Sequence, residues 1–142
     1  MEMAGLMKKI IFISLLLFPF FVNAQLGSTK SETITKNGYN YTTGTANDGT
    51  PYITYKKEQH TDASGYYTQY TVFYFVKGIC TQVCIFEPAT EINAWVVYFN
   101  NRYVKTGDLT WKDYNNDVVL TAEISESDGY RRVVVTSQYD TK

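Results

Sequence analysis

The feature that most constrains the fold is a succession of short apolar runs, each closed by turn-forming residues. The runs are rich in Tyr, Val, Thr and Ile, which favour β-strands. In residues 118–125, apolar and polar positions alternate, which predicts a half-buried strand. Turn residues such as those at 47–51 separate the runs and indicate an antiparallel sheet. The other predicted strands are residues 39–46, 52–58, 66–76, 79–86, 109–114 and 130–139.

Residues 89–103 depart from this alternation. Their apolar positions follow the i, i+3, i+4, i+7 spacing of a helix with one buried stripe: Ile92, Trp95, Val96, Phe99 and Tyr103. The segment AWVVYF taken alone also fits a buried strand, because Val, Tyr and Phe favour sheets. We predict an α+β fold, with a curved antiparallel sheet of six to seven strands and one helix, about 89–103, packed on one face. If residues 90–103 are not helical, the alternative is an all-β sandwich or small barrel.

The N-terminus has the pattern of a secretory signal peptide. Lys8 and Lys9 precede an apolar stretch at residues 10–22, and Val22 and Ala24 precede an expected cleavage site. The 13 apolar residues are fewer than the roughly 20 that a membrane-spanning helix needs. Residues 1–24 are therefore predicted to be removed, with residues 1–6 a candidate mis-called start ahead of Met7. We expect export to the periplasm or the extracellular space. The signal resembles those of Gram-negative bacterial exported proteins, and the mature chain is not expected to be embedded in a membrane.

The remaining 118 residues, 25–142, suit one domain with one core. Residues 25–37 are polar and are expected to form a flexible N-terminal segment, followed by a single globular β-rich domain at 38–142. Without Lys8, Lys9 and Glu2 the net charge is −2. A mildly acidic chain without basic clusters does not point to nucleic-acid binding.

Cys80 and Cys84 are the two cysteines of the chain. In a regular strand their Cα atoms would lie about 13 Å apart on one face, whereas a disulfide needs less than about 7 Å. We therefore predict free, at least partly buried thiols. The alternatives, an intrachain or an intermolecular bridge, follow from the oxidising compartment that export implies.

Residues for catalysis or metal binding are sparse. His60 is the single histidine and lies in a polar segment beside Glu58 and Asp62, which allows a general base oriented by a carboxylate. One histidine with two cysteines at this spacing is not a recognised zinc set. The sequence also lacks a nucleophile elbow, a calcium loop and a phosphate-binding glycine loop. We assign no catalytic residue, no metal ligand and no cofactor.

Tyrosine is the compositional anomaly, with 13 residues in the chain, all after the predicted signal. Alternation places Tyr66, Tyr70 and Tyr74 on one side of a strand, and Tyr39 and Tyr41 on one side of another. Tyrosine combines a flat apolar ring with a hydroxyl, which suits sugar stacking and protein interfaces, although it is also simply a good strand residue. Trp111, beside a turn, is predicted to be partly exposed and to join these five tyrosines in a binding surface.

The leading hypothesis is a small exported bacterial protein that binds a protein or a carbohydrate through a tyrosine-rich sheet face, without catalysis. One alternative is a small secreted hydrolase that uses carboxylates with His60. A second alternative is an inhibitor or immunity-type protein.

Overall fold

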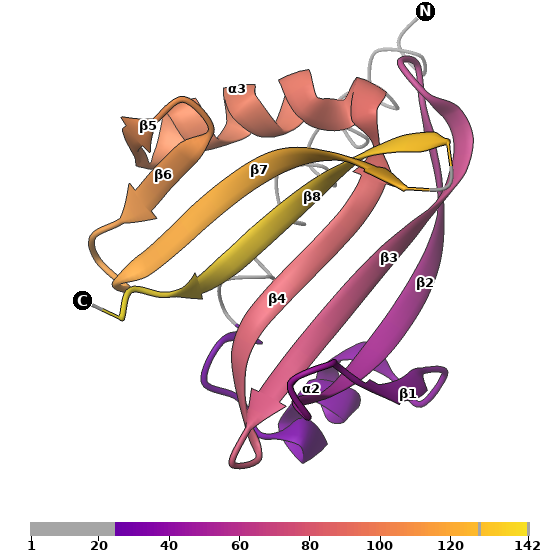
Figure 1. Ribbon diagram of the computed structural model, residues 1–142, viewed down its shortest axis with the longest axis vertical. Helices are drawn as coiled ribbons and strands as arrows, with labels where there is room; N and C mark the ends of the chain where they lie inside the picture. Colours follow the sequence, from indigo (N-terminus) through magenta and orange to yellow (C-terminus); the bar gives the residue numbers. More distant parts are fainter. Residues whose placement is uncertain (1–24, 128, 142) are drawn as a thin grey trace, which may run out of the picture.

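The computed structural model describes residues 25–127 and 129–141 and contains an open, eight-stranded antiparallel sheet with two short α-helices (Figure 1). The strand order is β1-β2-β3-β4-β8-β7-β6-β5. The predicted antiparallel α+β class is confirmed, with eight strands in place of six to seven and a second helix. The elements are α2 (Lys30–Asn37), β1 (Thr42–Thr45), β2 (Pro51–Thr61), β3 (Gly65–Val76), β4 (Ile79–Pro88), a 3-10 turn η1 (Ala89–Glu91), α3 (Ile92–Arg102), β5 (Val104–Gly107), β6 (Thr110–Asp113), β7 (Val118–Ser127) and β8 (Tyr130–Tyr139).

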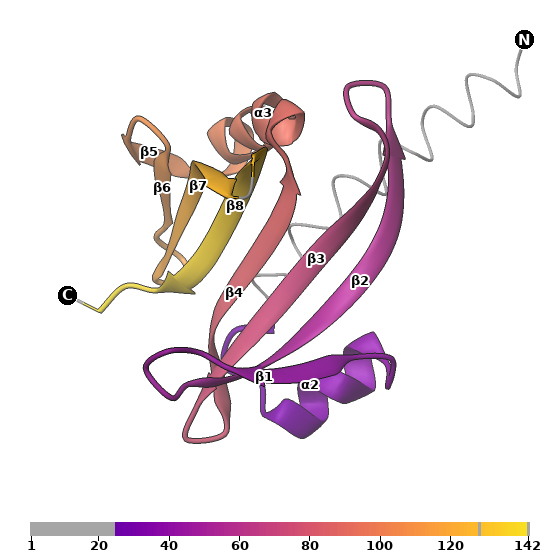
Figure 2. The same cartoon turned by 45° about the vertical axis from the view of Figure 1, so that its right-hand side comes forward.

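The sheet consists of two meanders joined by one strand pair. Strands β1 to β4 pair in sequence order, and so do β5 to β8. The β4–β8 pairing, from Gln82↔Gln138 to Pro88↔Arg132, connects the two halves, and helix α3 provides the crossover between them (Figure 2).

One face of the sheet carries the core. Paired positions bring Phe73, Val83 and Ser137 to this face across β3, β4 and β8. Trp95 and Phe99 of α3 pack against it, and both side chains are buried. Burial of each such side chain contributes about 2–3 kcal/mol. We call this the core face and the opposite side the outer face.

Helix α3 confirms the predicted helical stripe and decides against the all-β alternative. Pro88 precedes η1, and α3 runs from Ile92 to Arg102, so the helical segment ends one residue before the predicted boundary. Arg102 lies in the last turn, where a cation interacts favourably with the helix dipole. Neither α2 nor α3, in the part of the chain that the structure describes, has the length and apolar character needed to cross a membrane. The predicted signal peptide lies outside the described residues.

The structure differs from the expectation of a flexible segment at residues 25–37, because α2 forms there. The Thr29 hydroxyl accepts a hydrogen bond from the Glu32 backbone N–H at 3.1 Å, and the Glu32 carboxylate accepts one from the Thr29 N–H at 3.3 Å. This reciprocal capping box stabilises the start of a helix. Thr33 is fully buried, and Ile34 packs against the core.

The residues just before α2 form a strap along β4. The Gly27 N–H donates to the Cys80 carbonyl and the Cys80 N–H donates to the Ser28 carbonyl, each at 2.8 Å. Leu26 belongs to the buried apolar cluster on the core face, which includes Phe73, Val83, Trp95 and Phe99 and which we call the core cluster. Residues 25–37 are therefore part of the folded domain.

Two strand predictions also need correction. Strand β1 covers Thr42–Thr45, whereas the sequence predicted residues 39–46. Strand β5, Val104–Gly107, was not predicted; all four of its residues are exposed and it forms one edge of the sheet. An edge strand without a buried face carries no alternation of apolar and polar residues.

Both cysteines are free and buried, as predicted. The expectation that they share one face is wrong, because the β3–β4 register shifts between Tyr74 and Phe75. Cys80 pairs with Phe75 and faces the core, whereas Cys84 pairs with Val72 towards the outer face. Burial raises the pKa of the Cys80 thiol to about 11 and also raises the pKa of the Cys84 thiol.

Candidate functional site

The outer face gathers three of the predicted binding tyrosines. Tyr66, Tyr70 and Tyr74 alternate along β3, and the register pairs them with His60, Lys56 and Tyr52 of β2 respectively. Directly paired residues of an antiparallel sheet project from the same face. Trp95 and Phe99 of α3 belong to the core cluster, and Ile34 of α2 packs against it, so these six side chains lie on the face opposite the helices.

Ring contacts organise this surface. The Tyr52 and Tyr74 ring centroids are 5.5 Å apart at an interplanar angle of 57°, and those of His60 and Tyr66 are 4.3 Å apart at 56°. Tyr66 is 86% exposed, so its ring is open to a partner. Gly44 allows the Tyr52 ring to lie against β1, because a Cβ at position 44 would overlap that ring.

Tyr39 and Tyr41 do not join the outer face. The Tyr41 ring lies 5.9 Å from that of Tyr55 and packs against the core cluster. Tyr39 is 83% exposed but precedes β1, outside the sheet.

The prediction that Trp111 is partly exposed is wrong, because its side chain is fully buried. Its ring centroid lies 5.1 Å from that of Phe99, and its indole N–H donates to the Asn100 side-chain oxygen at 2.8 Å. Helix α3 covers β6 through these contacts. The sequence of β6 alone does not predict this tertiary contact.

A shallow, open groove of about 270 Å³ crosses β3, β4 and β8. The register places Tyr70 opposite Phe86, and Pro88 opposite Arg132, so these residues share the outer face. Sequence reasoning found only Tyr70 of this set, since the pairing of β4 with β8 is long-range. The groove is lined by Thr68, Tyr70, Phe86, Glu87, Pro88, Tyr130, Arg131 and Arg132.

His60 is exposed and does not line the groove. Within residues 25–127 and 129–141, the His60 ring packs on the Tyr66 ring, and no hydrogen bond joins His60 to a carboxylate. The neighbouring Glu58 carboxylate instead accepts from the Thr68 hydroxyl at 2.8 Å. The surroundings of His60 therefore do not orient it as a general base.

A buried polar cluster lies on the core side, at the junction of β4 and α3. Glu87 Oε1 accepts hydrogen bonds from the Tyr67 hydroxyl at 2.8 Å and the Gln69 amide at 2.7 Å, and Oε2 accepts from the Trp95 indole N–H. The Tyr67 hydroxyl also lies 3.4 Å from Glu91 Oε1. Burial, followed by the nearby Glu87 carboxylate, raises the pKa of Tyr67. All three donors to Glu87 are internal, so the cluster ties β3, β4 and α3 together.

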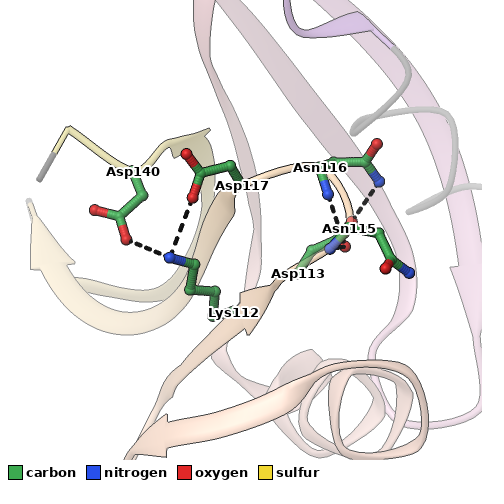
Figure 3. A network of polar contacts seen from close by, with 6 residues as sticks. All are labelled: Lys112, Asp113, Asn115, Asn116, Asp117 and Asp140. Atoms are coloured by element: carbon green, nitrogen blue, oxygen red, sulfur yellow. Dashed lines mark hydrogen bonds and ion pairs between the residues drawn. The ribbon is translucent and has the colours of Figure 1, made fainter.

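A second polar network closes the β6–β7 turn (Figure 3). Lys112 Nζ lies 3.1 Å from Asp117 Oδ1 and 2.8 Å from Asp140 Oδ2, and these carboxylates raise the pKa of Lys112. Asp113 accepts hydrogen bonds from the backbone and side chain of Asn116. Because the Lys112 ammonium group lies between these two carboxylates and pairs with both, we interpret this network as structural. Across the described ranges, no group of three or more His, Cys, Asp or Glu residues could hold a metal ion.

No protein-family model, no curated protein and no solved structure matches this chain. The functional argument therefore rests on the geometry of the outer face.

Proposed function

We propose that this chain is an exported, non-enzymatic binding domain that recognises its partner through the outer face of the sheet. The observation that carries the proposal is the shared face of Tyr66, Tyr70 and Tyr74, with Tyr52 and His60 beside them. Export rests on the signal-peptide pattern at residues 1–24.

The physical basis is the amphipathic character of the tyrosine ring. Such rings supply large contact areas at low conformational-entropy cost, and their hydroxyls add directional hydrogen bonds. Tyr70 and Tyr74 are half-buried within the sheet, whereas Tyr66 projects into solvent. At Tyr70 and Tyr74, strand pairing on both sides of β3 holds the backbone in place without a partner, which lowers the entropy cost of binding.

The test compares ligand binding by the wild-type protein and by variants of the outer face. A glycan array and partner capture would identify ligands, and calorimetry would measure their affinities. Tyr70→Ala and Tyr74→Ala are each expected to weaken binding by about tenfold or more, the effect of losing an interface aromatic side chain. Tyr114→Ala is the matched control, because Tyr114 is 63% exposed and follows β6.

The control variant should retain wild-type affinity. Equal affinities for all variants, with circular dichroism showing that each is folded, would place the binding site elsewhere. A protein that binds no ligand in either screen would refute the proposed function.

A further inference from the structure

The groove beside Tyr70 has features that specify a class of ligand. Strands β3, β4 and β8 form its floor, at the end of the sheet where the β3–β4 ladder stops at Tyr70↔Phe86 and the β4–β8 ladder stops at Pro88↔Arg132. Tyr70, Phe86 and Arg132 each have a paired residue on both sides, so their backbone groups are not open to an added peptide strand. At these three positions a ligand is recognised through side chains.

Those side chains combine aromatic rings with cations. Arg131 and Arg132 are exposed, and both line the groove. Lys56 adds a further cation, with Nζ 5.8 Å from the centre of the Tyr70 ring. Carboxylates also lie close to the groove: Glu87 lines it, Glu126 pairs with Arg131 across β7 and β8, and Glu58 accepts a hydrogen bond from Thr68.

The shape of the groove favours a small cyclic ligand. Its volume of about 270 Å³ lies just below the roughly 300–1,000 Å³ of small-molecule sites. Tyr70, Phe86 and Tyr130 provide apolar ring surface along the groove, and Thr68 provides a hydroxyl. Sugar rings bind to such aromatic surfaces through their C–H groups, while their hydroxyls hydrogen-bond to polar side chains at the rim.

We infer that the groove binds carboxylated carbohydrate, with a sugar ring against Tyr70 and its carboxylate on Arg132. A planar guanidinium matches a carboxylate in a bidentate pair. Arg132 faces the groove from the register position opposite Pro88. This inference deepens the proposed function and rests on it, since the groove is part of the same outer face.

The experiment is calorimetry of the purified protein with tetragalacturonate, supported by an array of uronate- and sialate-containing oligosaccharides. The methyl ester of tetragalacturonate is the ligand control, because it keeps the sugar rings and removes the charge. We expect the acid to bind and the ester to bind at least about tenfold more weakly, the contribution of one charge-assisted hydrogen-bond pair.

Variants assign the site. Arg132→Gln and Tyr70→Ala should each reduce affinity for the acid by about tenfold or more, and Arg132→Lys should restore only part of it because lysine lacks the bidentate fork. Lys105→Gln on β5 is the charge-matched control and should bind within about twofold of wild type, as expected for an exposed charge distant from the site.

The outcomes separate this inference from the proposed function. Absence of binding to every carboxylated glycan, while another ligand still depends on Tyr74, overturns the inference and leaves the binding function intact. Equal affinity for the acid and its ester, or Arg132-dependent binding of poly-glutamate as tight as that of tetragalacturonate, also overturns it. Absence of any ligand that depends on the outer face overturns both.

Discussion

Replacement of Glu87 by glutamine tests whether the buried cluster depends on an ionised acceptor. Glu87 is 6% exposed and accepts from three donors, one each from Tyr67, Gln69 and Trp95. Glutamine preserves the shape of the side chain but replaces one acceptor oxygen by an NH₂ group. With the amide oxygen at the Oε1 position, the NH₂ group faces the Trp95 indole N–H, which can only donate. In the other orientation the NH₂ group faces the Tyr67 hydroxyl and the Gln69 amide, which must then both act as acceptors.

The expected loss follows from these contacts. One buried donor without an acceptor costs about 1–3 kcal/mol, and the remaining bonds lose the roughly twofold advantage of a charged acceptor. Removal of a buried charge offsets part of this cost. We expect Glu87→Gln to lower the free energy of unfolding by about 2 kcal/mol, which shifts the midpoint by about 1 M urea for a typical domain of this size.

The assay is urea unfolding followed by far-ultraviolet circular dichroism, with Glu123→Gln as the control because Glu123 is exposed on β7. Tyr67→Phe, alone and combined with Glu87→Gln, completes a double-mutant cycle. The loss of the Tyr67 hydroxyl should cost less in the glutamine background than in the wild type, because the two groups are in contact. If Glu87→Gln unfolds at the wild-type midpoint, or if the two effects add without coupling, the ionised-acceptor explanation is refuted.

Two further predictions concern the core. Trp111→Ala should lower the free energy of unfolding by about 3–5 kcal/mol in urea titrations, because it empties a fully buried site; a change below about 1 kcal/mol would contradict the burial of this ring. Burial raises the pKa of the folded Cys80 thiol from an ordinary value of 9.0 to about 11. The contribution of the neutral thiol to the free energy of unfolding is therefore complete below pH 9 and is lost as the pH rises towards 11. Relative to Cys80→Ala, the wild-type protein should lose about 2 kcal/mol of stability over that interval, and parallel pH profiles for the two proteins would refute this.

Alternation and helical periodicity in the sequence correctly predicted several of the strands and helix α3. Alternation located β7, the tyrosine row of β3 and the limits of β8, residues 130–139. The apolar stripe located α3. A local signal was also present for α2, since Thr29 and Glu32 have the spacing of a capping box, but the polar composition of residues 25–37 suggested a loop.

Features that depend on distant pairings were not predictable in this way. The groove requires β8 to lie beside β4, and the burial of Trp111 requires α3 to cover β6. Both contacts depend on tertiary packing that the residues near them in the sequence do not encode. The opposite orientations of Cys80 and Cys84 result from a single register shift between β3 and β4. None of the three residues between the cysteines, Thr81, Gln82 and Val83, is of a type that predicts such a shift.

The arrangement of two meanders joined by β4 and β8 also has a consequence for how the chain folds. Within each meander, successive strands are joined by short turns, so each half can form through contacts that are close in sequence. The β4–β8 ladder instead joins residues about 50 positions apart, such as Ile85 and Val135, and its formation carries the larger loop-closure entropy. Helix α3 lies between these strands in the sequence, so its side chains reach a complete core face only when the ladder closes. We therefore expect formation of the β4–β8 ladder to couple the folding of the two meanders to the packing of α3.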